Sequence, residues 1–271
     1  MGTSLKEITT KEILARAAAS ARRGGLSDSE EHWALVQELH SRGGGEAFET
    51  SVAWCASQEP LLRCLGADVL GQLGCHDSRT FAGKSAPVLD SLLGDADSRV
   101  LQSALIALGH LRTGNLKRIC SLATHTSAEV RHAVANCLGG RDDRLAHETL
   151  ITLSADSDQH VRDWATFGLG TLGTADGEGI RNALVARLSD PDLEVRGEAM
   201  RGLAVRGDPR AVPAILAELE RDDVSALAIQ AAAALPRDGF LPELERLLKA
   251  NPASKALQLA VQACRGQDPA A

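Results

Sequence analysis

Three glycines in the segment "WATFGLGTLG" (164–173) have a spacing that could bind a nucleotide. Gly168, Gly170 and Gly173 fit the pattern G-x-G-x-x-G. In a dinucleotide-binding turn these glycines let the backbone approach a pyrophosphate at the start of a helix. The pattern has this meaning only when a strand precedes it and a helix opens at it. The elements around the glycines therefore decide whether this chemistry is possible.

The segment that holds these glycines recurs along the chain. Residues 161–173 ("VRDWATFGLGTLG") align with 195–207 ("VRGEAMRGLAVRG") and 62–74 ("LRCLGADVLGQLG"). The recurrent segments, which we number from their first residue, start at 31, 62, 100, 130, 161, 195 and 224. Positions one, five, nine and twelve are mostly apolar or small, which places them on one stripe of a helix. Each segment predicts an amphipathic helix that ends at a glycine or a polar turn.

A second amphipathic stretch follows each of these first helices. Examples are "AVPAILAELE" (211–220), "GIRNALVARL" (179–188) and "NLKRICSLA" (115–123). The sequences "DADSRV", "DSDQHV" and "DPDLEV" lead into the next first helix, and their aspartates are typical N-caps. Each unit of about 31 residues is therefore predicted to be a helix–turn–helix.

The repeated pattern V-R-x-x-A-x-x-x-L-G-x-L-G, followed by D-P-R-A-V-P-A-I-L, resembles a HEAT repeat. The resemblance is to the short bacterial type named after phycobilisome-lyase subunits, and residues 207–219 ("GDPRAVPAILAEL") are its cleanest copy. It implies an all-α fold, a right-handed α-solenoid of about seven HEAT-like helical pairs with terminal capping helices. We expect a capping helix and linker over 1–30, the solenoid over 31–249, and a capping helix with a frayed tail over 250–271.

The repeat removes the nucleotide interpretation of the glycines. Gly170 shares its position with Gly71, Gly109 and Gly139, late in a first helix and with no strand before it. We therefore expect no nucleotide and no other cofactor. The 38-residue spacing between the second and third repeats instead predicts an extended connection over 75–87.

Two residue pairs resemble the sites of enzymes built from helical repeats. Asp163-Trp164 is similar to the acidic and aromatic grip of a helical-repeat DNA glycosylase, but Trp164 shares its position with Leu65 and Ala133, which favours packing. His147-Glu148 resembles one His-Glu pair of deoxyhypusine hydroxylase, an iron enzyme that needs four. We expect no metal site and no catalytic residues, and nothing specific indicates phycobilin lyase activity.

An arginine recurs at the second position of four first helices. It could form a basic ridge for nucleic acid, or an Asp–Arg ladder between neighbouring repeats with acids such as Asp158 and Asp192. The periodicity favours the ladder. These arginines are Arg63, Arg131, Arg162 and Arg196.

The composition also restricts the function. The chain has 271 residues, 44% of them hydrophobic and only 3% aromatic, which favours packed helices. A net charge of −7 opposes binding to phosphate backbones. The six cysteines include no C-x-x-C pair and suit buried thiols in a reducing compartment. With no apolar run long enough to span a membrane and no secretory signal, we expect a cytoplasmic protein with no membrane partner.

The resemblance implies that the second helices line a concave surface, and their charges change sign from repeat to repeat. Such a mixed surface suits a protein or peptide better than a phosphate backbone, although any one of these residues could be merely solvated. We predict a monomeric, non-catalytic scaffold or adaptor, and some bacterial relatives of this size are suspected immunity-type proteins. The alternatives are a nucleic-acid-binding or DNA-damage-response protein and a lyase-type enzyme subunit. The residues predicted to bind the partner are Lys117, Arg118, Arg144, Glu148, Arg181, Arg187 and Glu218.

Overall fold

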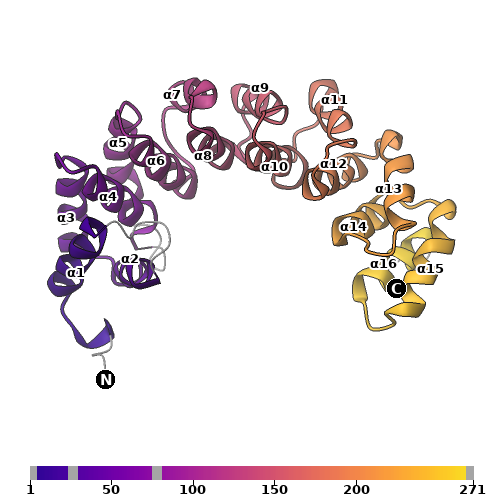
Figure 1. Ribbon diagram of the computed structural model, residues 1–271, viewed down its shortest axis with the longest axis horizontal. Helices are drawn as coiled ribbons and strands as arrows, with labels where there is room; N and C mark the ends of the chain where they lie inside the picture. The colour runs from indigo at the N-terminus through magenta and orange to yellow at the C-terminus, as the bar shows by residue number, and fades with distance from the viewer. Residues whose placement is uncertain (1–4, 24–29, 75–80, 267–271) are drawn as a thin grey trace. The chain divides into compact units, whose positions relative to one another are not determined.

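The computed structural model describes residues 5–23, 30–74 and 81–266. Every regular element in these ranges is a helix (Figure 1). The chain divides into two units, Met1–Cys137 and Leu138–Ala271, which are described in turn. The extended connection predicted over 75–87 is wrong for residues 82–87, which form the first part of helix α5 (Ala82–Leu92). Residues 75–80, which include Cys75, lie outside the described residues.

The N-terminal unit begins with α1, which packs against α2, α3 and α4 and buries Ile13, Leu14 and Ala17. Helical pairs follow in chain order, and in each pair the first helix corresponds to the recurrent sequence segment. The helices are α1 (Thr10–Arg22), α2 (Glu30–Arg42), α3 (Gly45–Cys55), α4 (Pro60–Gln72), α5 (Ala82–Leu92), α6 (Ser98–Leu111), α7 (Leu116–Ser121) and α8 (Ala128–Leu138).

The C-terminal unit continues the same alternation and ends with α16, which packs against α14 and α15. Helix α10 is prolonged by a π-helical turn over Gly168–Leu172. The all-α, repeat-built solenoid is therefore confirmed, and its handedness stays a prediction. The helices are α9 (Arg144–Leu153), α10 (Gln159–Phe167), α11 (Glu178–Arg187), α12 (Leu193–Val205), α13 (Val212–Leu219), α14 (Ala226–Ala234), α15 (Leu241–Ala250) and α16 (Lys255–Cys264).

The sequence signals for these helices act as expected. Asp97, Asp158 and Asp192 are N-caps whose carboxylates accept backbone N–H groups of the first turn. The ninth position forms the core of the stack and is at most 2% exposed in every repeat. Burial also raises the pKa of the Cys55 and Cys64 thiols to about 12, which fits cysteines that serve as small apolar side chains.

The first and second helices form separate layers in each unit. In the C-terminal unit α10, α12, α14 and α16 lie on the inner side of the curve, and α9, α11, α13 and α15 lie outside (Figure 1). The expectation that second helices line the concave side is thus wrong for this unit. The physical reason is that small residues let the first helices approach closely, as where Gly202 of α12 meets Gly170 of α10.

The recurrent arginine forms a ladder, but with other acids than expected. Arg63 Nε and Nη2 donate to Asp95 at 2.7 and 2.9 Å, and Arg162 donates to Asp190 at 2.9 and 3.1 Å. Each acid belongs to the next repeat and stands two residues before its N-cap. Asp192, one of the acids suggested from sequence, is instead the N-cap of α12.

The same arginines also close the turn that precedes their own helix. In each of the four, Nη1 donates to the backbone carbonyls five and six residues earlier, at distances from 2.7 to 3.2 Å. Each of these arginines therefore stabilises the turn before its own helix. Arg63 and Arg162 also bond to the turn before the first helix of the next repeat. The ladder fixes the register between repeats.

Candidate binding surface

The seven residues predicted to bind a partner all lie in the layer of second helices, and four of them are exposed. Lys117 and Arg118 belong to α7, and Arg144 and Glu148 belong to α9. Arg118 Nη1 donates to the carbonyl of Asp90 at 2.7 Å, and Arg144 pairs with Glu148 at 2.7 Å. These four side chains lie on the surface, two in the N-terminal unit and two in the C-terminal unit.

The other three are held by contacts within the chain. Arg187 Nη1 donates to the carbonyl of Ser154 at 3.0 Å and lies 3.4 Å from Asp190. The side chain of Glu218 is buried, with Arg221 Nε at 3.7 Å. Arg181 of α11 forms an ion pair with Asp176, which lies in the loop between α10 and α11. These three residues position the repeats.

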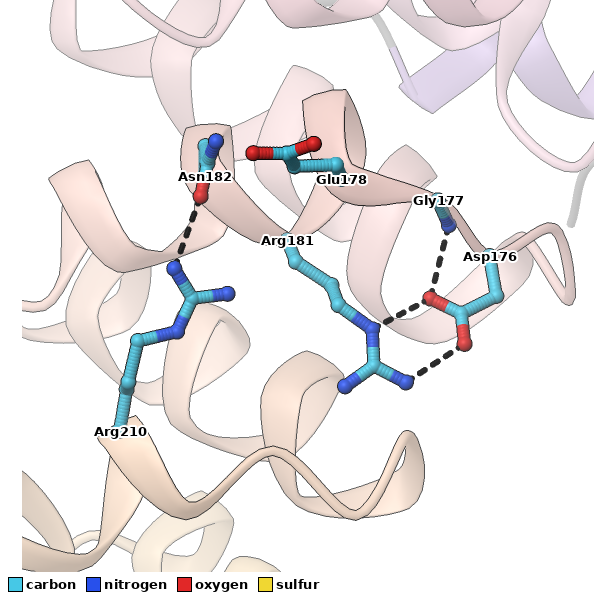
Figure 2. A pocket seen from close by; sticks show the side chains of 6 residues that line it. All are labelled: Asp176, Gly177, Glu178, Arg181, Asn182 and Arg210. Carbon is cyan, nitrogen blue, oxygen red and sulfur yellow. Dashed lines mark hydrogen bonds and ion pairs between the residues drawn. The ribbon is translucent and has the colours of Figure 1, made fainter.

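Arg181 and Arg210 face an open cavity of 380 Å³ in the second-helix layer (Figure 2). Arg181 donates to Asp176 at 2.6 and 2.7 Å and lies 3.4 Å from Asp208. Arg210 donates to Asn182 at 2.8 Å and to Asp208 at 2.6 Å. The hydrogen bond from Arg210 to Asp208 is the main cause that lowers the pKa of this carboxyl group to about 2. Because both guanidinium groups are already paired with carboxylates, this cavity is an ion-pair network between repeats.

A buried arginine that sequence reasoning missed supports the π-helical turn. Arg206 stands at position twelve, where Leu73 and Leu111 stand in other repeats. Its guanidinium donates to the carbonyls of Leu169 and Gly173 at 2.7 and 3.0 Å, and also to those of Gly170, Ala175 and Gly202. It therefore satisfies the backbone carbonyls that the end of α10 leaves without helical partners.

The first helices present a different chemistry in the N-terminal unit. Trp33 of α2 is 40% exposed and lines a cavity of 160 Å³ between α2, α4 and α6. We call this cavity the Trp33 pocket. Its remaining lining residues are Cys64, Asp68, Arg99, Gln102, Ser103 and Ile106.

Asp68 is the acidic group of the Trp33 pocket. Burial raises the pKa of its carboxyl group to about 7, although a hydrogen bond from Ser103 acts in the opposite direction. Its backbone carbonyl lies 2.9 Å from His40 Nε2. Arg99, on the same rim, is held by Asp97 at 2.7 and 3.0 Å. The pocket thus combines an indole ring with a poorly solvated carboxyl group.

A related patch lies on the first helices of the C-terminal unit. Trp164 packs edge-on against Phe167 with ring centroids 5.6 Å apart, and it is partly exposed rather than buried in the core. Burial raises the pKa of the neighbouring Asp163 and of Glu198. Glu198 accepts a hydrogen bond from Thr171, whose hydroxyl oxygen accepts one from Arg201. We call these residues the Trp164 patch.

The positions of these residues in the repeat explain why sequence reasoning missed them. Both surfaces are built mainly from positions three, four, seven and eleven of the first helices, which lie beside the stripe formed by positions one, five, nine and twelve. In the repeats that start at 62, 100, 130, 161 and 195, position seven holds Asp68, Ile106, Asn136, Phe167 and Arg201. This change of residue type at one position of an otherwise regular repeat was the sequence signal that could have indicated these surfaces.

Among the described residues, no group of three or more His, Cys, Asp or Glu side chains is placed to hold a metal ion. Glu148 is paired with Arg144, and His147 lies 4.0 Å from Asp142. None of the helices described is long and apolar enough to cross a membrane.

Comparison with known proteins agrees with the repeat architecture. Residues 195–221 match the family described as PBS lyase HEAT-like repeat. Protein YibA of Escherichia coli K12 is 28% identical over 221 residues, which are 78% of this chain and 77% of YibA. The X-ray structure of E. coli YibA covers 98% of both chains at 22% identity, with a TM-score of 0.73.

Two further structures share the fold at lower similarity. An engineered protein covers 95% of this chain and 78% of its own, with 20% identity and a TM-score of 0.58. A chain from the structure in which Kap95p binds RanGDP gives 15% identity and a TM-score of 0.57, over 96% of this chain and 41% of its own. At these identities the structures establish the fold alone.

Proposed function

We propose that this chain, whose residues 195–221 match the PBS lyase HEAT-like repeat family, is a non-catalytic scaffold that binds a protein or peptide. Its partner is held by the first-helix layer, through side chains that differ from repeat to repeat. An adaptor and an immunity-type protein would both act in this way. A similar repeat fold occurs in the structure in which Kap95p binds RanGDP.

The observation that carries the proposal is the pairing of exposed aromatic rings with poorly solvated carboxyl groups. Trp33 lines one pocket with Asp68 in the N-terminal unit. In the C-terminal unit the partly exposed Trp164 follows Asp163 in the sequence, and burial raises the pKa of Asp163 and of Glu198. Exposed tryptophan is enriched in the regions of protein interfaces that contribute most to binding. These carboxyl groups also oppose a phosphate backbone, which supports a protein partner over nucleic acid.

The test compares the two layers in the full-length chain. Tagged wild-type protein is used to capture partners from a lysate of the source organism, with half of each sample treated with nuclease. The Trp33→Ala/Trp164→Ala variant removes the aromatic contacts of the first helices. The matched Lys117→Ala/Arg144→Ala variant removes exposed charges that were predicted from sequence on the second helices.

We expect a nuclease-resistant protein partner that binds directly when purified, with binding weakened by at least about tenfold in the tryptophan variant. The charge variant should bind like wild type. Loss of binding only in the charge variant would transfer the binding surface to the second helices. Recovery of nuclease-sensitive nucleic acid alone would overturn the scaffold proposal.

A further inference from the structure

We propose that the Trp33 pocket binds one basic side chain of the protein partner, with arginine the best fit. Asp68 would be its counter-ion and Trp33 the wall against which it packs. This inference rests on the proposed scaffold function and names the residue class that the scaffold recognises.

The size of the pocket fits one side chain rather than a small-molecule substrate. Its volume is 160 Å³, below the 300–1,000 Å³ that is typical of pockets for drug-sized ligands. The indole of Trp33 and the side chain of Ile106 provide apolar walls for the aliphatic part of the guest. An arginine presents a flat guanidinium group that stacks on an indole and donates several hydrogen bonds.

The charges around the pocket favour a cation. Among the described residues, no cationic side chain forms an ion pair with Asp68, and Ser103 provides its one hydrogen-bond donor. Arg99 is held by Asp97. The adjoining surface carries His40 and His110, and burial lowers the pKa of His40, which keeps that ring neutral. An incoming guanidinium would therefore supply the partner that a poorly solvated carboxylate needs.

Acid–base catalysis is the main competing role for a carboxyl group with a pKa near 7. In such a role the carboxyl group could activate a nucleophile of the chain, and the candidate that lines the same pocket is the thiol of Cys64. Because burial raises the pKa of Cys64 to about 12, it stays protonated and is a poor nucleophile. The pocket is therefore better suited to binding than to catalysis.

The indole N–H signals provide a direct test, since the chain has three tryptophans. The ¹⁵N-labelled full-length protein is titrated with the capped peptide acetyl-Gly-Arg-Gly-amide, and the norleucine peptide serves as the uncharged control. Trp33→Phe identifies the relevant signal. Asp68→Asn keeps the shape of the side chain and removes its charge, and a thermal melt checks that this variant is folded.

We expect the Trp33 signal to move with the arginine peptide, to move less with lysine, and to stay unchanged with norleucine. In Asp68→Asn the affinity should fall by at least about fivefold. For wild type it should fall by about three- to tenfold between pH 8 and pH 6, because a group with a pKa of about 7 is mostly ionised at pH 8 and mostly protonated at pH 6.

Three results would overturn the inference: no shift at Trp33, an equal shift with norleucine, or equal binding by folded Asp68→Asn. The captured partner then separates the two proposals. If it binds wild type and Asp68→Asn equally, the pocket assignment fails and the scaffold stands. If no protein partner is captured at all, the scaffold proposal fails.

Discussion

Gly202 of α12 lies directly against Gly170 of the π-helical turn that prolongs α10. A β-carbon added at Gly202 would be 2.6 Å from the α-carbon of Gly170, and one added at Gly170 would be 2.8 Å from the carbonyl oxygen of Glu198. The two backbones are therefore in contact, with no room for a side chain between them. This contact sets the distance between α10, with its π-helical turn, and α12.

Gly202→Ala should destabilise the C-terminal unit by about 2 kcal/mol, because the backbones must separate to admit the methyl group. Gly179→Ala in α11 is the control, since its β-carbon would make only ordinary contact at 3.5 Å. That change should stabilise by about 0.5–1 kcal/mol through helix propensity. Urea unfolding monitored at Trp164, with Trp33 and Trp54 changed to Phe, measures both. Equal stability of the two variants would refute the contact.

Asp190→Ala should lower the free energy of unfolding by about 3 kcal/mol, since it leaves the guanidinium of Arg162 without its carboxylate. The side chains of Arg162 and Asp190 are 12% and 2% exposed. The exposed pair Arg16–Glu12 is the comparison, with exposures of 43% and 46%, and Glu12→Ala should change stability by less than about 1 kcal/mol. Chemical denaturation tests both, and a cost below about 1 kcal/mol at Asp190 would mean that the ladder has no stabilising role.

Arg206→Leu should destabilise by about 3 kcal/mol, because several carbonyls around the π-helical turn lose their donor. Leucine is the residue at this position in other repeats, so apolar packing alone does not explain the arginine. Hydrogen exchange should accelerate over Gly168–Leu172 in the variant. Arg237→Leu, which loses one bond to a neighbouring carbonyl, is the control. Unchanged exchange in Arg206→Leu would contradict this assignment.

The buried carboxyl group of Asp68 should make the stability of the N-terminal unit depend on pH. Its folded pKa of about 7 lies above the unfolded value of about 3.9. The folded state thus holds a proton more tightly, and this contribution, complete below about pH 4, is lost as the pH rises through 7. Relative to Asp68→Asn, the free energy of unfolding of wild type should fall by on the order of 2 kcal/mol between pH 5 and pH 8.

The melting temperatures of wild type and Asp68→Asn are measured across this pH range. Both proteins carry Trp164→Phe, so that the fluorescence of Trp33 and Trp54 reports on the N-terminal unit. Parallel pH profiles would show that the carboxyl group titrates as it does in water.

The sequence by itself determined the repeat. Recurrence of leucine at position nine, small residues at position five and aspartate before each first helix predict paired helices, because all three are local requirements of helix formation and of packing between neighbours. The resemblance of the glycine spacing to a nucleotide site could also be dismissed from sequence, because the same glycines recur at the same helical position.

Tertiary structure decided which layer faces inward, which acids complete the arginine ladder, and which polar side chains are free to meet a partner. In the sequence, three charged residues look like surface charges: Arg181, Arg187 and Glu218. In the structure the two arginines bond to groups of neighbouring turns, and the side chain of Glu218 is buried. Asp68 looks like any helical aspartate, and only the packing of α2 and α6 against α4 removes water from it. Such contacts join residues about 30 positions apart, which periodicity within one helix does not specify.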